Sequence, residues 1–458
     1  MKFSDLDARQ RVTALVDRDS FDPAFPDSSQ TRFVLGTAAV AGRPVLVAFS
    51  DGHVLGGTFG VLEAERISTL LDRAADAAAP PVVILGFDTG GVRVEEGPRA
   101  LAATSAAGIA LAQLSVRGVR ALSLISGPRG CFGAPSVMAS LPERVVMTEG
   151  SFWGLTGPKL IDSVRDSAAD ASMAAAAAAN RLHNGDCDAV VPDSAGALRS
   201  QLEDFVAAPA VTPVEPREII GRSAAVTAEL WQRLRSSNSY ASPQPRWSRR
   251  RGLLEYTLRG QWHADGPIRR AGMLQAGFGL LAGHPTLSLV LGPAAGAGDG
   301  LGIEEAALLA QLLAEVVARP GPPALILSFL FCQGHAVDSA QERFGIHRAL
   351  AESLRAMVIA KRCSHPVVTV LGGGTYGAAY FALAAPSHRI LAMQGTAVAP
   401  MSPEVLRAFQ QLRGRDPEYQ ADAHLAERIP EVRIVESVIR LPRILRDELK
   451  ALLSRSSL

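Results

Sequence analysis

The 458-residue sequence predicts an α/β protein in which one architecture is built twice along the chain. Short apolar runs alternate with segments long enough for helices of ten or more residues, which is the pattern of parallel strands joined by crossover helices. Three segments of the first half also recur in the second half, in the same order and at nearly one offset. Such a recurrence indicates an internal duplication.

The first repeated segment, Gly60–Phe87, aligns without gaps with Gly302–Phe329, and both carry a leucine-rich helical pattern, a Pro-Pro pair and a terminal Phe. The turn GCFGAPSVMASLP from Gly130 then matches GTYGAAYFALAAP from Gly374, and RVVMTEGS from Arg144 matches RILAMQGT from Arg389. Each repeat is therefore expected to contain helix, strand, helix, strand, glycine-rich turn, helix and strand. The expected strands are Val82–Leu85, Ala121–Ile125 and Val145–Met147 in the first copy, and Leu325–Leu327, Val367–Leu371 and Ile390–Ala392 in the second.

The repeat pattern lapses between residues 207 and 251, which predicts domains at 1–206 and 252–458 joined by a linker at 207–251. Within that linker, Ala224–Ser237 has the pattern of a short amphipathic helix and Ser242–Arg251 that of a polar connection. The basic cluster of Arg246 and Arg249–Arg251 is either an anion site or, as we favour, a solvated part of the linker.

Composition excludes several classes of protein. The chain has 46 Lys and Arg against 45 Asp and Glu, a net charge of +1, so neither nucleic-acid binding nor membrane binding driven by bulk charge is expected. Its four cysteines include no C-x-x-C pair, which argues against a disulfide framework, a zinc ribbon or a redox motif. The opening residues MKFSDLDARQRV lack the apolar region of a signal peptide, so the expected location is the cytoplasm.

The glycine-rich segment Ser126–Ser136 follows an apolar strand and precedes a helix, where backbone N–H groups converge and can stabilise an anion. Neither copy of this turn has the lysine and hydroxyl of a nucleotide-binding loop or a dinucleotide-binding fingerprint. An oxyanion hole for a carbonyl or thioester enolate therefore fits better than a phosphate site. The alternative is that the glycines only allow a helix and a strand to pack closely.

A second glycine-rich segment, Phe87–Gly97, also follows a strand, where open α/β sheets place their ligand sites. The amides of Gly90 and Gly91 with the cation of Arg93 would suit a carboxylate or a carbonyl oxygen. The alternative is a surface turn in which Arg93 pairs with Glu95 or Glu96.

The motifs GGTFG (Gly56–Gly60), DTGGVRVEEG (Asp88–Gly97), GPRGCFGAPS (Gly127–Ser136) and LTGP (Leu155–Pro158) resemble, in order and spacing, the beta subunit of biotin-independent malonate decarboxylase. In the second half, Phe331–Leu354 and Leu371–Glu404 resemble the gamma subunit of the same enzyme. The chain thus resembles a natural beta–gamma fusion within the wider superfamily of crotonase-like acyl-CoA carboxyltransferases. Asn184–Asp193 is similar to the usual exit from the crotonase-like domain.

This resemblance implies two tandem crotonase-like domains that release CO2 from a malonyl group and leave an acetyl group. The malonyl group would be held as a thioester on the phosphopantetheine-like arm, phosphoribosyl-dephospho-CoA, of an acyl carrier protein. It implies no directly bound cofactor and no metal, because the thioester takes up the electrons released with CO2. The implied partners are the carrier protein and the carrier-protein transferase (alpha) subunit, in a hetero-oligomer.

Transferred residue by residue, the resemblance implies oxyanion donors at the amides of Cys131, Phe132 and Gly133, with Gly90, Gly91, Arg93 and Gly130 lining the same pocket. The matching turn of the second half, with Gly374, Tyr376, Gly377 and Ala378, would supply an opposing hole. Either hole could hold the thioester, and the wider superfamily favours the first. No residue stands out as the acid that protonates the enolate, although His335, His347 and Tyr376 are candidates, and His347 is also expected to line the substrate site.

Where a lysine and small residues are expected, the gamma-like half reads GGGTYG, and residues Ala421–Leu458 match loosely, so a purely structural second half is possible. The competing functions are a biotin-dependent acyl-CoA carboxyltransferase, which would share the fold and both holes, and a non-catalytic scaffold for a carrier-protein complex. A nucleophilic role for Cys131 is disfavoured, because the sequence supplies no evident histidine partner for it.

Overall fold

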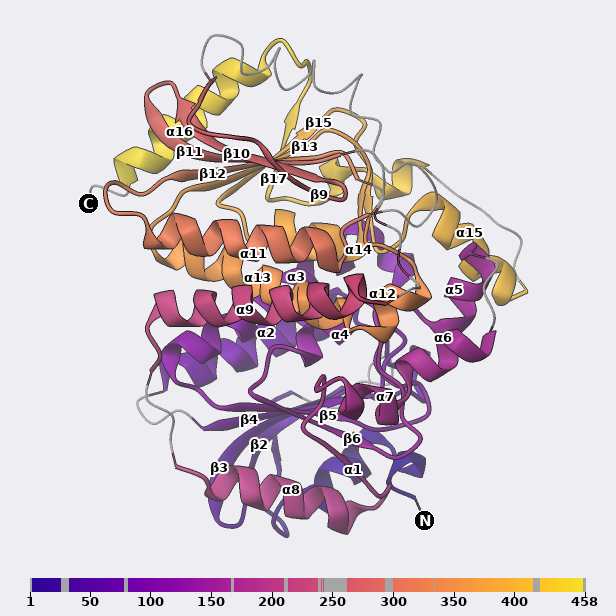
Figure 1. The fold of residues 1–458 in the computed structure, drawn as a ribbon. Helices are drawn as coiled ribbons and strands as arrows, with labels where there is room; N and C mark the ends of the chain where they lie inside the picture. The colour runs from indigo at the N-terminus through magenta and orange to yellow at the C-terminus, as the bar shows by residue number, and fades with distance from the viewer. Residues whose placement is uncertain are drawn as a thin grey trace. The chain divides into compact units, whose positions relative to one another are not determined.

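A computed structural model describes residues 2–25, 33–77, 81–165, 169–209, 213–237, 240, 242, 262–292, 300–332, 334–414 and 421–455 (Figure 1). The chain divides into two compact units. Unit 1 contains Met1–Glu96, Ala103–Glu215 and Glu342–Ala351, and unit 2 contains Gly97–Ala102, Pro216–Gln341 and Glu352–Leu458. Each unit is an α/β structure with one mostly parallel sheet, as the sequence predicts.

The sheet of unit 1 has its strands in sequence order: β1 (Asp22–Pro23), β2 (Val34–Val40), β3 (Arg43–Phe49), β4 (Val82–Phe87), β5 (Ala121–Ile125), β6 (Arg144–Thr148) and β7 (Ala189–Val191). The pairs among β1, β2 and β3 are antiparallel, and all pairs from β3 to β7 are parallel. Helices cover both faces of the sheet: those before β1 and after β7, which lie outside the run of parallel strands, cover one face, and crossover helices such as the one between β3 and β4 lie on the other, which explains the unbroken apolar runs of β4 and β5.

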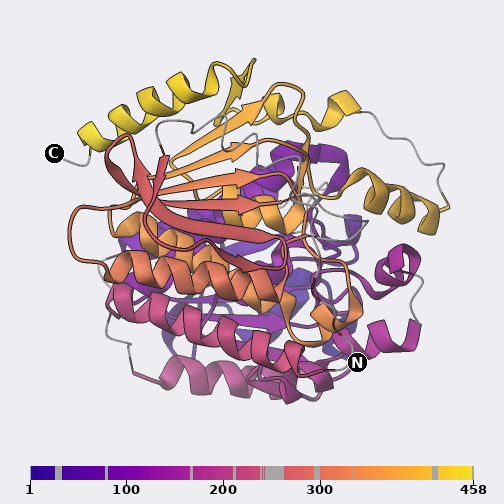
Figure 2. The same cartoon turned by 45° about the horizontal axis from the view of Figure 1, so that its top comes forward.

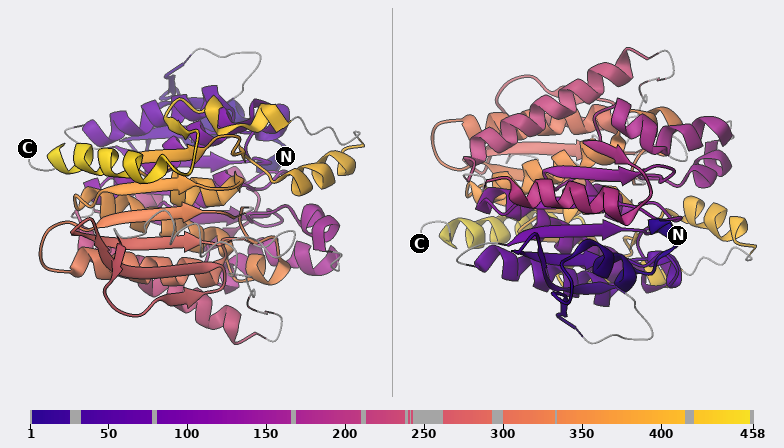
Figure 3. Two further views of the ribbon diagram at one scale, coloured as in Figure 1. Left: turned by 90° about the horizontal axis from the view of Figure 1, so that it is seen from above. Right: turned by 90° about the horizontal axis from the view of Figure 1, so that it is seen from below.

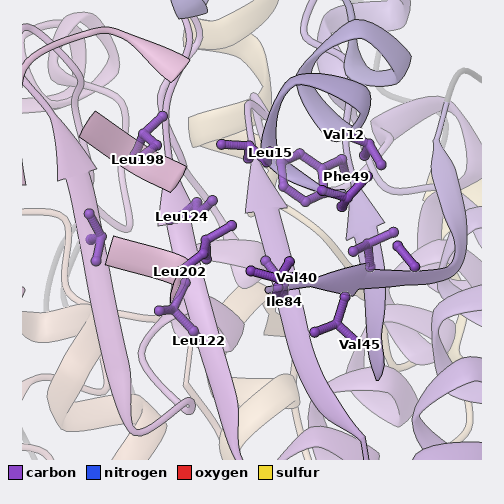
Figure 4. Packing of buried hydrophobic residues seen from close by; sticks show 14 of the residues in the cluster. Val12, Leu15, Val40, Val45, Phe49, Ile84, Leu122, Leu124, Leu198 and Leu202 are labelled. Atoms are coloured by element: carbon purple, nitrogen blue, oxygen red, sulfur yellow. The ribbon is translucent and has the colours of Figure 1, made fainter. Parts of the chain in front are cut away.

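The core of unit 1 lies between this sheet and the helices α1 (Ala8–Leu15) and α8 (Ala195–Ala207). In Figure 4, apolar side chains of the two helices meet inward-facing side chains of β2 to β5; the labelled residues are Val12, Leu15, Leu198, Leu202, Val40, Val45, Phe49, Ile84, Leu122 and Leu124. The helix α2 (Val61–Asp76) lies on the other side of the sheet in Figure 1.

The sheet of unit 2 has the order β17-β15-β13-β12-β11-β10-β8, and β9 pairs with β10. Its strands are β8 (Trp262–Ala264), β9 (Arg269–Ala271), β10 (Leu274–Leu281), β11 (His284–Leu291), β12 (Leu325–Leu330), β13 (Val367–Leu371), β15 (Arg389–Met393) and β17 (Val432–Val435). The strands from β11 to β17 are parallel and lie side by side in Figures 2 and 3. The helix α16 (Leu441–Arg455) covers one face through Leu441, Leu445, Leu449 and Leu452.

The duplication is visible in the structure. All six expected strands form, as β4, β5 and β6 in unit 1 and β12, β13 and β15 in unit 2, and in each unit they are parallel neighbours. A further correspondence is an antiparallel hairpin, β2–β3 or β10–β11, that leads into the parallel strands. Both hairpins turn on an Ala-Gly pair with positive φ, Ala41-Gly42 and Ala282-Gly283, the backbone shape that tight two-residue hairpins require.

The division of the chain differs from the predicted boundaries in three places. The predicted short helix is part of α9 (Pro216–Arg235), which belongs to unit 2 and packs against α11 (Ile303–Ala318). Glu342–Ala351, expected in the second domain, belongs to unit 1, whereas Gly97–Ala102, expected in the first, belongs to unit 2. The basic cluster of Arg246 and Arg249–Arg251 lies outside the described residues.

Candidate active site

Loops that leave the carboxyl ends of β3, β4, β5 and β6 meet at one edge of the sheet of unit 1, as the ends of neighbouring parallel strands must. Single parallel bridges join Thr89 to Cys131 and Cys131 to Trp153, and another joins Phe59 to Val92. The glycine-rich turns after β4 and β5 are thus held together by a short backbone ladder beyond the end of the sheet.

This ladder engages all three amides predicted as oxyanion donors. The N–H of Cys131 donates to Phe152 O at 2.9 Å, that of Phe132 to Thr89 O at 3.1 Å, and that of Gly133 to Leu155 O at 2.9 Å. In this structure none of the three is available to a substrate oxygen, which corrects that prediction. The physical reason is that the ladder takes up N–H groups that a turn in isolation would leave open.

The predicted donors after β4 are engaged as well. The N–H of Gly90 donates to Gly56 O at 2.9 Å, and that of Gly91 donates to Thr89 Oγ1 at 3.1 Å. Arg93 forms ion pairs with Glu63 at 2.8 Å and Glu96 at 2.6 Å, so its guanidinium neutralises carboxylates of the protein itself. The alternative interpretation of this segment, a turn in which Arg93 pairs with a neighbouring glutamate, is the one that the structure shows.

Two neighbouring amides remain open instead. Within the described part of the chain, the N–H groups of Val92 and Ala134 donate to no acceptor. They lie close together, because a Cβ on Gly133 would stand 3.1 Å from Gly91 Cα and 3.6 Å from Val92 N. Val92 and Ala134 are both buried, and two adjacent, unengaged amides in such surroundings can serve to stabilise an oxyanion.

Each open amide follows a glycine with positive φ, 117° at Gly91 and 67° at Gly133. Positive φ alone does not leave the next amide open, because Gly130 has a φ of 70° and Cys131 N nevertheless donates to Phe152 O. The two open amides lie one position beyond the predicted sets, and no local sequence signal separates Gly-Val and Gly-Ala from Gly-Cys. Gly130 has a structural role, because its missing side chain makes room for Phe152 O, 2.3 Å from where a Cβ would lie.

A corresponding turn exists in unit 2. Leu301 N donates to Gly334 O at 3.0 Å and Ala336 N donates to Leu301 O at 3.1 Å, the same clasp that holds Phe59 between Gly91 and Arg93 in unit 1. His335 therefore corresponds to Val92, and Gly377 and Ala378 correspond to Gly133 and Ala134. Burial lowers the pKa of His335 to about 4, so its imidazole is neutral at neutral pH.

The side chains of this second turn differ from those of the first. The imidazole of His335 lies over Gly377, with Nδ1 3.4 Å from where a Cβ would stand. The phenol of Tyr376 folds back over Gly374, whose hypothetical Cβ would lie 2.5 Å from Tyr376 Oη. Tyr376 corresponds to Phe132, which also carries a ring, whereas the imidazole of His335 stands where the first turn has Val92.

His347 is buried in unit 1 and not at a substrate surface. Its ring packs on Trp153 with centroids 4.3 Å apart, it is fully buried, and neither ring nitrogen has a hydrogen-bond partner. Burial lowers the pKa of His347, and the guanidinium groups of Arg181 and Arg348 lower it further, so the ring is neutral. The expectation that His347 lines the substrate site is therefore not what the structure shows.

Two buried charged groups that the sequence analysis did not single out hold the loops in place. Asp88 accepts from Arg11 Nη1 at 3.0 Å and from Arg129 N at 2.9 Å, and burial raises its pKa although Arg11 opposes the shift. Glu342 accepts from the amides of Leu155 at 2.9 Å and Thr156 at 2.5 Å. Burial likewise raises the pKa of Glu342.

The four cysteines are free thiols, and burial raises the pKa of Cys131 well above its ordinary value. A buried thiol of this kind is a poor nucleophile. Among the residues that the structure describes, no group of three His, Cys, Asp or Glu side chains is placed to hold a metal ion.

Two α/β units with matching glycine turns at the ends of their parallel strands define a tandem crotonase-like protein. Comparison of the sequence with known families identifies the family to which this chain belongs. The chain belongs to the carboxyl transferase domain family, whose profile matches residues 6–411.

Several curated proteins are similar to parts of the chain. The beta subunit of acetyl-coenzyme A carboxylase carboxyl transferase from Desulfitobacterium hafniense is 30% identical over 34% of this chain and 57% of its own length. The protein from Salinispora tropica that carries subunits beta/alpha of acetyl-coenzyme A carboxylase carboxyl transferase is 27% identical over 81% of this chain and 66% of its own length. The malonyl-S-ACP:biotin-protein carboxyltransferase from Malonomonas rubra is 25% identical over 35% of this chain and 59% of its own length.

The chain thus spans about half the length of the curated relatives it matches; for the 12S subunit of methylmalonyl-CoA carboxyltransferase from Propionibacterium freudenreichii the share is 37%. Among solved structures, the Pseudomonas malonate decarboxylase MdcD-MdcE hetero-dimer is similar to 45% of this chain and 88% of its own, at 29% identity and a TM-score of 0.41. The transcarboxylase 12S structure covers 99% of this chain and 90% of its own, at 20% identity and a TM-score of 0.41.

Proposed function

We propose that this chain decarboxylates a malonyl thioester to an acetyl thioester and CO2. The observation that carries the proposal is the pair of open, adjacent amides of Val92 and Ala134. When the bond to CO2 breaks, its electron pair passes into the thioester and places negative charge on the carbonyl oxygen. Two fixed N–H donors bind that enolate oxygen more strongly than the ground-state carbonyl, and this difference lowers the barrier.

The surrounding residues suit this chemistry. The ladder that engages Cys131, Phe132 and Gly133 fixes the backbone on both sides of the open pair, so the donors need little reorganisation during the reaction. The thioester carbonyl is itself the electron sink for the released pair. In this chain the oxyanion donors are the amides of Val92 and Ala134, and Arg93 has the separate role of neutralising Glu63 and Glu96.

The malonyl group is the substrate that the motifs favour, because Gly56–Gly60, Asp88–Gly97 and Gly127–Ser136 resemble the beta subunit of biotin-independent malonate decarboxylase. The similar protein from Malonomonas rubra is named for action on malonyl-S-ACP. The proposal therefore includes an acyl carrier protein with a phosphoribosyl-dephospho-CoA arm as the substrate carrier. It also includes a carrier-protein transferase subunit as a partner in the cytoplasm.

A biotin-dependent carboxyltransferase is the second candidate, because most of the named relatives are subunits of acetyl-CoA or propionyl-CoA carboxylases or of a transcarboxylase. Such an enzyme would use the same two amides to stabilise the same enolate. It differs in the fate of the carboxyl group, which is exchanged with biotin and is not released as CO2.

The test is to incubate the purified full chain with malonyl-loaded carrier protein, and separately with malonyl-CoA, in the absence of biotin. CO2 release with formation of the acetyl thioester is the expected result. A parallel incubation with a biotinylated carrier protein measures carboxybiotin. Absence of CO2 with formation of carboxybiotin would replace the decarboxylase by the carboxyltransferase, and absence of both products would favour a non-catalytic scaffold.

A further inference from the structure

The turn after β3 carries a histidine and an aspartate that are hydrogen-bonded to each other. Asp51 is 2% exposed; its Oδ1 accepts from His53 N at 3.0 Å and lies 2.9 Å from His53 Nδ1. Its Oδ2 accepts from Ala8 N at 3.3 Å. The carboxylate is thus fixed by two segments of unit 1, and it fixes the imidazole in one orientation.

The fold does not require this pair. The second repeat builds the same hairpin and the same parallel sheet, yet the sequence after its second hairpin strand, Gly292–Gly296, contains neither Asp nor His. Because His53 is 46% exposed, packing does not explain it either. The pair is a feature of the first repeat alone, the repeat that carries the proposed oxyanion donors.

The turn lies directly against the loop that ends in Val92. Gly56 O accepts from Gly90 N at 2.9 Å, and a Cβ on Gly52 would stand 2.5 Å from Asp88 Oδ2. The residues on both sides of His53 therefore touch the segment from Asp88 to Gly90. This contact places the turn that carries His53 beside the loop that carries the first open amide.

The backbone of this turn is held in a disfavoured conformation. Leu55, Gly56 and Gly57 have φ values of 50°, 65° and 64°, three left-handed residues in succession, and Leu55 is not a glycine. Its side chain is 59% exposed, so core packing does not stabilise it. Residues held in the left-handed region against their preference concentrate at ligand and catalytic sites.

We propose that His53 is the acid that protonates the enolate carbon, and that Asp51 positions it; this inference rests on the proposed function. A carboxylate only accepts hydrogen bonds, so Nδ1 of the imidazole carries a proton and Nε2 is the position that exchanges one. Charged groups beside this turn include Asp88, which accepts from Arg11 Nη1 and Arg129 N, and Arg129, whose Nε donates to Gly52 O at 3.3 Å.

In the first step of the reaction, the bond from the α-carbon to the carboxylate breaks, CO2 leaves, and the electron pair enters the thioester to form an enolate. The Nε2–H bond of protonated His53 then breaks, and its proton forms the new C–H bond of the acetyl group. The exposed face of the ring recovers a proton from water, so one proton is consumed for each CO2 released.

By microscopic reversibility, an acid that protonates the enolate also removes a proton from the acetyl methyl group. The test therefore follows exchange of deuterium into the methyl group of acetyl-CoA in D2O by NMR, with the full chain. We expect His53→Gln to slow this exchange about 100-fold or more. The matched control is His183→Gln, an exposed histidine at the end of α7 (Ala178–His183), which leaves the rate unchanged.

Two further variants separate a chemical role from a structural one. In His53→Ala, added imidazole should restore exchange, which it would not do if the ring only supported the turn. Asp51→Asn should lower kcat and leave KM near its wild-type value, because Asp51 acts through His53.

Exchange that is unchanged in His53→Gln, or that is absent from the wild-type protein, would overturn the role of His53. CO2 release from malonyl-CoA is measured on the same samples. If exchange depends on His53 while no CO2 appears, the decarboxylase proposal fails and the assignment of His53 stands.

Discussion

The Glu342 carboxylate accepts a hydrogen bond from the amide of Leu155 at 2.9 Å, across 187 positions of the chain. The carbonyl of Leu155 in turn accepts from the amide of Gly133, also at 2.9 Å. Arg181 reinforces the contact, because its Nη2 donates to Glu342 O at 2.7 Å and its Nε donates to Trp153 O at 2.9 Å. A residue from the second half of the sequence thus fixes the glycine turn of the first half.

We predict that Glu342→Ala lowers both stability and turnover. The substitution leaves the buried amides of Leu155 and Thr156 without an acceptor, which costs about 2–5 kcal/mol of unfolding free energy. It also removes the contact that holds the amide of Leu155, the residue whose carbonyl accepts from Gly133 N. The glycine turn should then be less well fixed, so kcat should fall more than KM rises. Urea unfolding and steady-state decarboxylation kinetics check the two effects.

Glu342→Gln supplies one carbonyl oxygen and should recover part of the loss. The control is Glu436→Ala, which removes an exposed glutamate paired with Arg440 and should change neither property. Normal kcat and normal stability in Glu342→Ala would contradict the positioning role.

The fold could be predicted because its signals are local. β5 and β13 form at Ala121–Ile125 and Val367–Leu371 as expected, since each is a short apolar run followed by a glycine-rich turn. The exchange of Glu342–Ala351 into unit 1 could not be predicted in this way. It depends on contacts between residues more than 150 positions apart, such as Asn180 Nδ2 with Arg343 O at 3.1 Å.

The three amides after β5 predicted as oxyanion donors are engaged in backbone hydrogen bonds, and the two open amides lie one position further along the same glycine-rich turns. The sequence showed where glycines follow strands, and that was enough to find the loops after β4 and β5. Which N–H stays open depends on distant acceptors, namely the carbonyls of Phe152 and Leu155, and on the φ values of Gly91 and Gly133. Neither is visible in a local motif.

Gly133 offers a direct test of the open amide pair. A Cβ at this position would lie 3.1 Å from Gly91 Cα, so Gly133→Ala must displace the segment that carries Val92. Gly150 has a similar φ of 77°, and a Cβ there meets nothing within 4 Å, which makes Gly150→Ala the matched control. Gly150→Ala should lose about 1–2 kcal/mol of stability for an alanine with positive φ. Gly133→Ala should lose more, because Gly133 combines its φ of 67° with a ψ of −155°, a conformation that essentially only glycine adopts.

Only Gly133→Ala should lose turnover, by about 100-fold for a displaced oxyanion donor. Decarboxylation rates at saturating malonyl thioester report the displacement of the segment that carries Val92. Urea midpoints of both variants report the loss of stability caused by a positive φ at alanine. Equal rates in the two variants would show that the turn at Gly133 does not act on the reacting oxygen.

Substitution by glutamine at the corresponding glutamates of the two repeats, Glu63 and Glu305, should have different effects on stability as pH changes. Glu63 Oε2 and Glu305 Oε2 accept from the first amide of their motif, Gly60 at 3.0 Å and Gly302 at 2.9 Å. Glu63 also pairs with Arg93, whereas Ala336 holds the corresponding position in the second repeat. Burial raises the pKa of Glu305 to about 7.

Because the folded-state pKa of Glu305 lies above its ordinary value of 4.5, the folded protein holds a proton that the unfolded chain releases. The stability this proton confers is complete below about pH 4.5 and is lost as pH rises through 7, a change of about 3 kcal/mol. Glu305→Gln stays neutral, so it should remove this pH dependence. Its one amide oxygen cannot accept from both Met273 N and Gly302 N, which donate to Oε1 at 2.7 Å and Oε2 at 2.9 Å in the wild type, so the test is the pH dependence and not the absolute stability.

Glu63→Gln should instead destabilise the protein at pH 7.5, by about 2 kcal/mol, because it leaves Arg93 with Glu96 as its remaining carboxylate. Urea unfolding of both variants and the wild type at pH 5 and pH 7.5 makes the comparison, and differences from the wild type cancel the titration of other groups. A Glu305→Gln protein that keeps the wild-type difference in stability between pH 5 and pH 7.5 would mean that the buried carboxylate stays ionised over this range. In that case the two repeats would share one charge arrangement, and the substitution of Ala336 for Arg93 would have no electrostatic consequence.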